Sequence, residues 1–227
     1  MTCVALIAVP VAPAAHADGG ALPDVSAHGP WTLTDRSEEP GDAWRMYRRD
    51  VTGSDFSAFR LEATIDAPPD DVAAALLRDV RDPRVSQKNT KKTILRDDPA
   101  LTLVYSYIEM PIVSDRDVTT ATVRSFDPET GSHRVEWHAT TDGPAPRPGV
   151  VRLEQSSGSW TFSPLPDGRT WAVYENHTDI GGAIPAWLLD RLMGDTVVDG
   201  IVSLRARLRR DRPHASRKAE PPAPRAR

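Results

Sequence analysis

Apolar and polar residues alternate one by one through residues 59–66, and this alternation constrains the fold of the chain more than any other feature. The apolar positions are Phe59, Leu61, Ala63 and Ile65. The polar positions between them are Arg60, Glu62, Thr64 and Asp66. A period of two is typical of a half-buried β-strand, because successive side chains point to opposite sides of a sheet. Further segments with strand character lie at residues 102–110, 117–126, 132–140, 150–162 and 169–179. The segments at 117–126 and 132–140 are joined by "DPETG", which predicts a hairpin with Gly131 at its end.

Two segments have helical character instead. The first covers residues 70–80, and the second is a long apolar-rich segment over residues 184–210. Gly181 and Gly182 precede the long helix and permit backbone angles that other residues avoid, while Pro185 fits the first helical turn. Antiparallel strands with one early and one long terminal helix predict an α+β domain whose helices lie on one side of a curved sheet.

The two ends of the chain differ from this central part. Residues 1–17 contain no Lys, Arg, Asp or Glu and close on Ala15-His16-Ala17, which predicts a secretory signal peptide; the alternative is a disordered N-terminus. Removal of this segment takes away the only cysteine, so the exported protein needs no disulfide. We expect an N-terminal segment over residues 18–40 and the main domain over residues 41–210.

The last segment, residues 211–227, is predicted to be a disordered basic tail. From Arg209 onwards the chain carries seven basic and two acidic residues, together with four prolines. Such a tail suits transient contact with an anionic membrane surface, and the alternative is a solvated end without a partner. No further stretch has the roughly 18 uncharged apolar residues of a membrane span.

Patterns for enzyme, metal and nucleic-acid chemistry are missing from the sequence. His133 and His138 lie five residues apart on a predicted strand and therefore on opposite faces, which does not suit a shared metal. The sequence contains no HExxH, GxSxG, P-loop or GxGxxG motif, and the basic run at residues 87–92 lacks interleaved aromatic residues. We therefore expect no catalytic residues, no metal, no cofactor and no nucleic-acid partner.

Spaced landmarks in the second half of the chain resemble a known family. The segment "MPIVSDRDV" contains Arg116 and Asp117, and the segment from residue 157 to residue 192 carries the remaining landmarks: Gly158, Trp160, Pro164, Thr170, Tyr174, Asp179, Gly181, Gly182, Pro185, Trp187 and Leu188. In order and spacing, from about Trp44 to Leu208, they resemble the START lipid-transfer domains of the helix-grip superfamily. The resemblance implies a curved antiparallel sheet wrapped around a long C-terminal helix, with a hydrophobic tunnel that holds one lipid.

Candidate ligand-binding residues come from apolar strand faces and from the terminal helix. Tyr105 and Tyr107 share a face and combine ring area with a hydroxyl, and Glu175 shares a face with Val173. The full predicted set is Leu103, Tyr105, Tyr107, Arg116, Trp137, Val173, Glu175, Trp187, Leu188, Met193, Val197 and Ile201. For Trp137 the alternative is an ordinary core position.

Arg116 is the predicted cation of the cavity floor, where it pairs with Glu109, Glu175 or a ligand head group. The alternative is a salt bridge at a strand edge without a ligand role. Gly181, Gly182 and Pro185 form the predicted hinge of a helical gate over the cavity, because a closed tunnel gives a lipid no route in. The alternative is that Asp179 and the glycines are a turn and a cap.

These observations predict an exported, monomeric, non-enzymatic protein that binds and transports a lipid or another hydrophobic small molecule. Two alternatives remain open: a helix-grip enzyme of the cyclase or aromatase type acting on a polycyclic substrate, and a sensor or scaffold that binds a protein partner and leaves the cavity empty. An apolar cavity with one polar cluster favours transport, a water-accessible acid–base pair favours catalysis, and a filled interior favours the scaffold.

Overall fold

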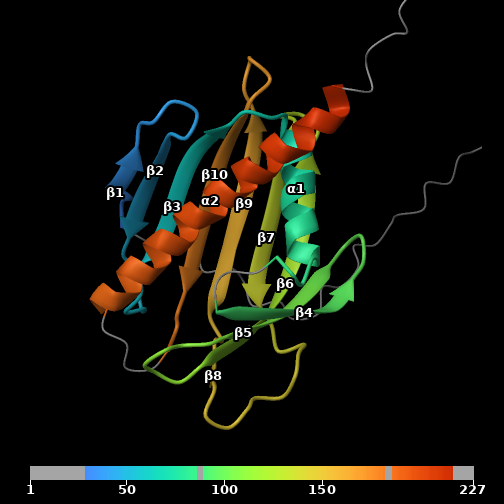
Figure 1. Ribbon diagram of the computed structural model, residues 1–227. Helices are drawn as coiled ribbons and strands as arrows, with labels where there is room; N and C mark the ends of the chain where they lie inside the picture. Colours follow the sequence, from blue (N-terminus) through green and yellow to red (C-terminus); the bar gives the residue numbers. More distant parts are fainter. Residues whose placement is uncertain (1–28, 86–88, 182–185, 217–227) are drawn as a thin grey trace, which may run out of the picture.

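The computed structural model describes residues 29–85, 89–181 and 186–216, with the backbone alone at residues 186–195 and 212–216. In this described part, ten strands form one curved sheet in the order β1-β2-β3-β10-β9-β7-β6-β5-β4, with β8 paired in parallel to β6 (Figure 1). All other neighbours are antiparallel. The strands are β1 Thr32–Ser37, β2 Trp44–Arg49, β3 Ala58–Ile65, β4 Thr90–Asp97, β5 Thr102–Ile108, β6 Arg116–Asp127, β7 Ser132–Ala139, β8 Val151–Arg152, β9 Ser156–Pro164 and β10 Thr170–Thr178.

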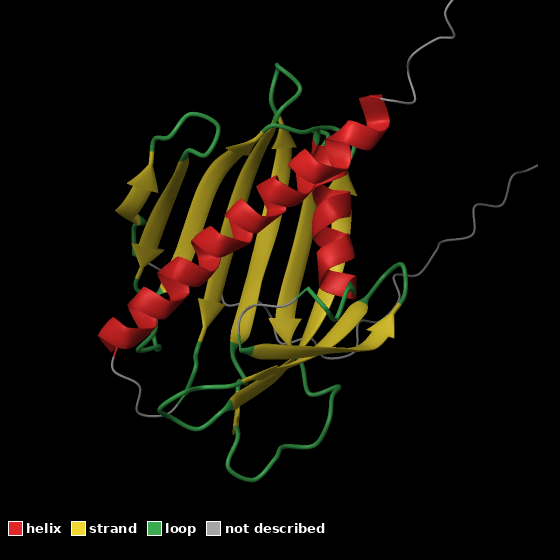
Figure 2. Cartoon of the chain, in the orientation of Figure 1, coloured by secondary structure: helices red, strands yellow, loops and turns green. Residues whose placement is uncertain are grey.

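Both helices lie on the same face of the sheet (Figure 2). The long helix α2, Ala186–Ser216, crosses β3, β10 and β9 diagonally, and α1, Pro69–Arg81, packs beside it against β7 and β9 (Figure 1). Strands β4 and β5 turn away from the central strands and pass below the end of α1. The two helices, the central strands and β4 therefore surround a common interior.

The core is built where the apolar face of the central strands meets α2. Tyr174 of β10 pairs with Leu61 on one side and with Trp160 on the other, so these side chains share the face that the helices cover. Helix α2 contributes an apolar stripe at the spacing of successive helical turns: Val197, Ile201, Leu204 and Leu208. This inner face supplies the main hydrophobic core.

The C-terminal half of α2 is attached to the sheet by arginines. Arg205 is 4% exposed, and its Nη2 donates to the backbone oxygens of Ala43 at 2.7 Å and Thr64 at 2.8 Å. One turn later, Arg209 donates to Asp42 Oδ1 at 2.8 Å. These contacts fix this part of the helix over β3 and the loop before β2.

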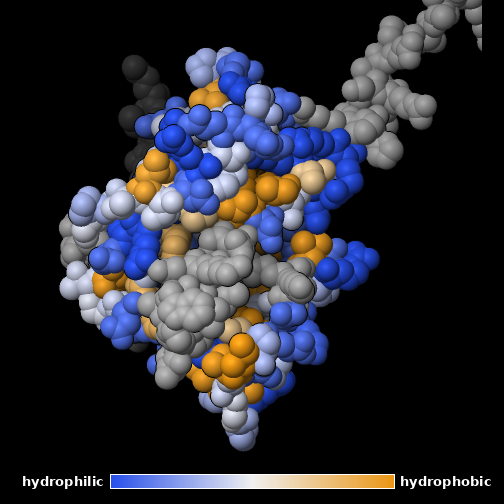
Figure 3. Space-filling view, turned by 60° about the vertical axis from the view of Figure 1, so that its left-hand side comes forward, coloured by the Kyte–Doolittle hydropathy of each residue, from blue (hydrophilic) through white to orange (hydrophobic). Residues whose placement is uncertain are grey.

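Apolar surface outside the core is scattered. On the face shown in Figure 3, apolar side chains form separate patches between larger hydrophilic areas. Across the described residues the exposed large hydrophobic side chains are Leu33, Leu95, Ile112, Val123, Phe126 and Val202. Single exposed apolar residues of this kind are normal for a protein surface.

The predicted α+β architecture, with helices on one side of a curved antiparallel sheet, is confirmed. The hairpin between β6 and β7 turns at Gly131 as predicted, with φ of +67°. Three strands were missed, namely β1, β2 and β4, and the segment predicted as one strand over residues 150–162 is divided into β8 and β9. Helix α2 continues to Ser216, beyond the predicted end at Arg210 and into the expected tail.

The expected signal peptide lies outside the described residues, as does the tail from residue 217 onwards. Within the described part of the chain, neither helix combines the length and the apolar character that crossing a bilayer requires.

Candidate functional site

A cavity of about 690 Å³ lies between the two helices, β4 and the inner face of β9 and β10. Its volume falls within the range of about 300–1,000 Å³ that is typical of small-molecule sites. The residues that line it are Leu76, Asp79, Val80, Val85, Lys92, Trp160, Tyr174, Thr196, Val197, Asp199, Gly200, Ser203 and Leu204. They come from five elements and one loop, so the cavity exists only in the folded chain.

Aromatic side chains form the sheet side of this cavity. The rings of Trp160 and Tyr174 have their centroids 4.8 Å apart, and Trp137 stacks on Tyr174 with a centroid distance of 5.6 Å. Burial raises the pKa of the Tyr174 hydroxyl well above its usual value, because the phenolate would lose its solvation there. Tyr174 therefore stays a neutral phenol at physiological pH.

Charged side chains gather at the end of the cavity where α1 meets β4. Lys92 Nζ donates to the backbone oxygen of Asp79 at 2.6 Å, and Arg207 of α2 forms an ion pair with the Asp79 carboxylate. Burial raises the pKa of Asp79 in spite of Arg207, and burial lowers the pKa of Lys92 in spite of Asp79. The site thus combines apolar and aromatic walls with a charged cluster of Asp79, Lys92 and Arg207, and Asp199 of α2 adds an exposed carboxylate to the lining.

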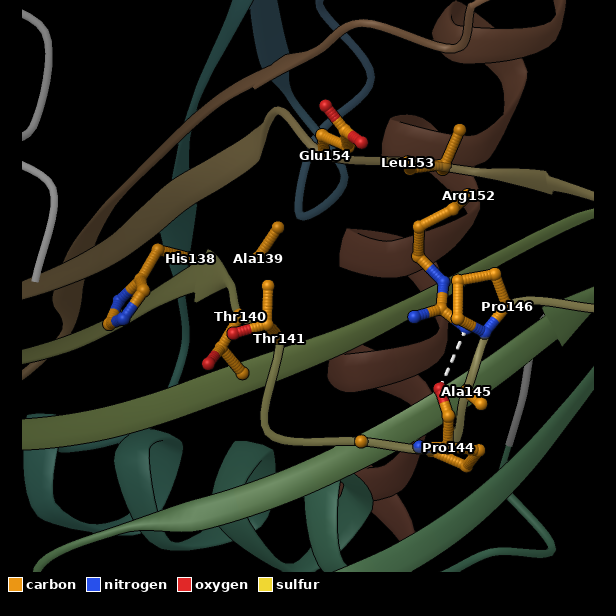
Figure 4. Close-up of a pocket in the computed structure, with 11 residues that line it drawn as sticks. His138, Ala139, Thr140, Thr141, Pro144, Ala145, Pro146, Arg152, Leu153 and Glu154 are labelled. Carbon is orange, nitrogen blue, oxygen red and sulfur yellow. Dashed lines mark hydrogen bonds between the residues drawn. The ribbon is translucent and has the colours of Figure 1, made fainter.

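A second pocket, of about 570 Å³, lies on the opposite side of the sheet, where the loop after β7 approaches β8 (Figure 4). In this view both helices lie behind the strands. Arg152 lines the pocket, but it holds the Asp117 carboxylate through Nε and Nη2 and donates to the Pro144 oxygen at 3.0 Å. Because these contacts occupy its guanidinium, the interior cavity is the stronger candidate site.

Comparison with known proteins agrees with this geometry. The START domain family matches residues 26–214, which is most of the chain. The chain belongs to the START domain family. An uncharacterized protein of Pseudomonas aeruginosa is 30% identical over 172 residues, which cover 73% of this chain and 82% of that protein.

Solved structures of the same fold include proteins with StAR-related names. The STAR-related lipid transfer protein of Xanthomonas axonopodis, solved as fragment 25–204, is 29% identical with a TM-score of 0.67; the match covers 79% of this chain and 98% of that one. Human StAR-related lipid transfer protein 5 shares the fold at 18% identity with a TM-score of 0.64, over 79% and 86% of the two chains. The helix-grip architecture predicted from the sequence is confirmed.

The START domain places the predicted β5 residues on the face opposite to the helices. Tyr105 donates its hydroxyl to Asp117 Oδ2 at 2.9 Å, Tyr107 donates to Asp115, and Leu103 is buried beside Tyr105 on the same face. Burial raises the pKa of Tyr105, with a further contribution from the hydrogen bond to Asp117. Leu103, Tyr105 and Tyr107 therefore do not line the interior cavity, because their side chains point away from the helices.

Glu175 and Val173 also point away from the helices. They alternate with Tyr174, which faces the core, and Glu175 Oε1 lies 3.4 Å from Arg60 Nη1. The expected inward carboxylate is therefore an ion-pair partner on the outer face of β10.

Arg116 lies on the inner face and is 2% exposed. Its Nε donates to the Ile180 oxygen at 3.4 Å, its Nη2 donates to the Gly181 oxygen at 3.2 Å, and its Nη1 donates to the Ser114 oxygen. The predicted pairing with Glu109 or Glu175 is wrong, since Glu109 binds Lys91 and Glu175 binds Arg60. Burial lowers the pKa of Arg116, and Asp115 counteracts this. Its role toward a ligand stays a prediction.

The remaining predicted residues divide into described and undescribed positions. Val197 lines the cavity, and Ile201 and Trp137 pack in the adjoining core. Gly181 has φ of +59°, and its N–H donates to Asp179 Oδ1 at 2.8 Å, which is the geometry of the turn alternative. The side chains of Trp187, Leu188 and Met193, together with Gly182 and Pro185, lie outside the described residues.

Sequence reasoning missed Asp79, Lys92, Tyr174 and Ser203 as cavity residues. The four-residue spacing of Leu76 and Val80 on α1 was a usable signal. Lys92 was hidden because adjacent lysines suggest an exposed basic run, although the strand turns only one of the two inward. Among residues 29–85, 89–181 and 186–216, no group of three or more His, Cys, Asp or Glu could hold a metal ion.

Proposed function

We propose that this START domain binds a lipid or another hydrophobic small molecule in the interior cavity and carries it without catalysing a reaction. The observation that carries the proposal is the cavity itself, which is lined by Trp160, Tyr174, Val197, Leu204 and the apolar face of α1. The lipid-transfer names of the Xanthomonas and human structures support the same ligand class.

Hydrophobic burial is sufficient for such binding. Covering about 400 Å² of apolar ligand surface at about 25 cal/mol per Å² yields about 10 kcal/mol before the entropy of association is subtracted. One or two polar groups then suffice to orient a head group.

The contacts of Asp79, one of the two acidic residues that line the cavity, favour carriage over catalysis. Asp79 is held in an ion pair by Arg207, and Lys92 donates to a backbone oxygen rather than to a second titratable side chain. Efficient acid–base catalysis needs a titratable group within reach of the substrate proton and a pKa near the working pH. The pKa of Asp79 is raised and that of Lys92 is lowered, but Arg207 holds the Asp79 carboxylate in an ion pair, and this favours a binding protein over acid–base catalysis.

Mass spectrometry of compounds extracted from the purified protein tests the proposal. We expect one class of apolar molecule at close to one equivalent per chain. Gly200 lines the cavity at an exposed position, and a Cβ built on it meets no atom within 4 Å, so Gly200→Leu adds bulk on the open side of the cavity without a clash. This variant should lose the copurifying molecule, whereas the exposed Val202→Leu should retain it. The function would be refuted if no apolar molecule were extracted from the wild-type protein and if the protein took up no apolar compound.

Arg116→Leu tests the predicted ligand role of the buried arginine. If Arg116 also holds a head group, the folded variant should bind the extracted molecule more weakly. Unchanged affinity in a variant that melts as the wild type does would eliminate that role.

Export, the monomeric state and transient membrane contact complete the proposal. The uncharged segment over residues 1–17 supports export, and N-terminal sequencing of the mature protein tests cleavage after Ala17. Native mass spectrometry tests the monomer, and flotation with anionic vesicles tests contact through the basic tail. Binding to neutral and anionic vesicles alike would argue against an electrostatic contact.

A further inference from the structure

The charged end of the interior cavity contains a lysine, Lys92, whose ammonium has hydrogen-bond donors that the neighbouring residues do not use. Lys92 is half-buried on β4, where it pairs with Ser106 and shares the inward face of the strand with Ile94. Its ammonium has three N–H donors, and the hydrogen bond to the Asp79 oxygen uses one of them. Lys92 lines the cavity, so its remaining donors are available to a molecule that enters it.

The charges around Lys92 leave a positive excess. Asp79, Asp82 and Arg207 are the charged groups that act on its ammonium. The Asp79 carboxylate is neutralised by Arg207, and Asp82 is bound by Arg84 at 2.8 Å. Both of these acidic neighbours therefore have a cation of their own. Asp199 of α2 also lines the cavity, but it is exposed and is not among the charges that act on the Lys92 ammonium, so Lys92 remains the unbalanced charge at this end.

Burial makes the charged form of Lys92 less stable while the cavity holds no anion. The pKa of Lys92 is lowered because its ammonium loses solvation, which Asp79 and Asp82 offset in part. An anion placed against the ammonium would restore the lost stabilisation, since charged hydrogen bonds gain strength where water is excluded.

The rest of the cavity determines what kind of anion fits. Trp160, Tyr174, Val197 and Leu204 supply the apolar lining, and Ser203 adds a hydroxyl on the α2 side. A small hydrophilic anion would leave this lining unfilled, whereas an uncharged lipid would leave the ammonium without a counter-charge. A lysine presents one compact point charge, and a single monovalent head group such as a carboxylate is sufficient to balance it.

We propose that Lys92 binds the carboxylate of an amphiphile with one long apolar chain, of the fatty-acid class, with the chain in the cavity between α1, α2 and β10. The inference rests on the proposed function, because it assumes that the interior cavity takes a ligand. It adds the class of ligand and the residue that selects it.

Equilibrium dialysis with radiolabelled oleate and with radiolabelled methyl oleate, each below its aggregation concentration, tests the inference. The two probes have the same chain and differ in the charge of the head. We expect the wild type to bind oleate about ten- to a hundredfold more tightly than the ester, which is the range of a hydrogen bond to a charged group. Lys92→Gln should abolish this preference by weakening oleate binding while leaving methyl oleate within about twofold.

Lys91→Gln is the matched control, because Lys91 is exposed on the adjacent position and pairs with Glu109. It should keep the preference, and Lys92→Arg should keep most of it. Thermal melting verifies that each variant is folded, and the comparison of the two probes on the wild type needs no variant.

Equal binding of both probes by the wild type, or an undiminished preference in folded Lys92→Gln, would overturn the role of Lys92 and leave the proposed function intact. Binding of neither probe would overturn the fatty-acid class. The extraction experiment then decides independently whether the proposed function also fails.

Discussion

Replacing Arg205 by Met tests how α2 is held against the sheet. The guanidinium is almost completely buried, and its Nη2 donates to the oxygens of Ala43 and Thr64 at 2.7 and 2.8 Å. Methionine keeps the apolar stem but removes both hydrogen bonds, so one carbonyl just before β2 and one near the end of β3 lose this partner.

The expected loss follows from these two bonds and from the desolvation of the charge. A hydrogen bond to a charged group contributes about 1.5–3 kcal/mol. Against this, Nε and Nη1 of Arg205 have no hydrogen-bond partner in the described structure, and Nη1 lies 3.8 Å from Asp42 Oδ1. Burial accordingly lowers the pKa of Arg205. We expect a net loss of about 3 kcal/mol in the free energy of unfolding, or about 6–12 °C in Tm for a domain of this size.

Urea denaturation and thermal melting of Arg205→Met measure this loss, with Arg209→Met as the control. Arg209 binds the same loop from the exposed side of α2, and its removal should change the free energy of unfolding by less than about 1 kcal/mol. If Arg205→Met were as stable as the control, the desolvation of the guanidinium would cancel its bonds. Arg205 would then not anchor α2 to the sheet.

Three further predictions concern the sheet. Phe162→Ala should lower the free energy of unfolding by about 3–5 kcal/mol in urea titrations, because the ring is fully buried; a loss below 1 kcal/mol would contradict this. Gly158→Ala should destabilise the fold, since its Cβ would lie 2.3 Å from Trp137 Cζ2, and an unchanged Tm would refute the close contact. Arg152 holds the pKa of Asp117 below its usual value, so this carboxylate stabilises the fold above about pH 4 and loses that effect as the pH falls through its lowered pKa. The Tm difference between wild type and Asp117→Asn should therefore narrow in acid, and a constant difference would refute the assignment.

Local patterns were sufficient for much of the fold. Alternation identified β3, and the turn at Gly131 identified the hairpin of β6 and β7, because both signals lie within a few neighbouring residues. Strand β1 was missed because its residues are mostly exposed at the edge of the sheet and show no alternation. Strand β2 was missed because arginines surround its buried Met46.

The orientation of the strands could not be obtained in the same way. Alternation shows that Tyr105 and Tyr107 share a face, but which face turns toward α2 depends on pairing with distant strands. Strand β5 is buried on both faces, so exposure could not decide between them. The charged end of the cavity was equally inaccessible, because Asp79, Lys92 and Arg207 are far apart in the chain and meet only through tertiary packing.

Two stripes of α2 have different roles, and this separation has a consequence for the evolution of this protein. Val197, Gly200 and Leu204 line the cavity from one stripe of the helix, whereas Arg205 and Arg209 hold the sheet from a neighbouring stripe. Substitutions that reshape the cavity can accumulate on the first stripe while the arginines keep the helix docked. Proteins that descend from one ancestral domain can therefore diverge in the ligands they bind while α2 keeps the same position on the sheet.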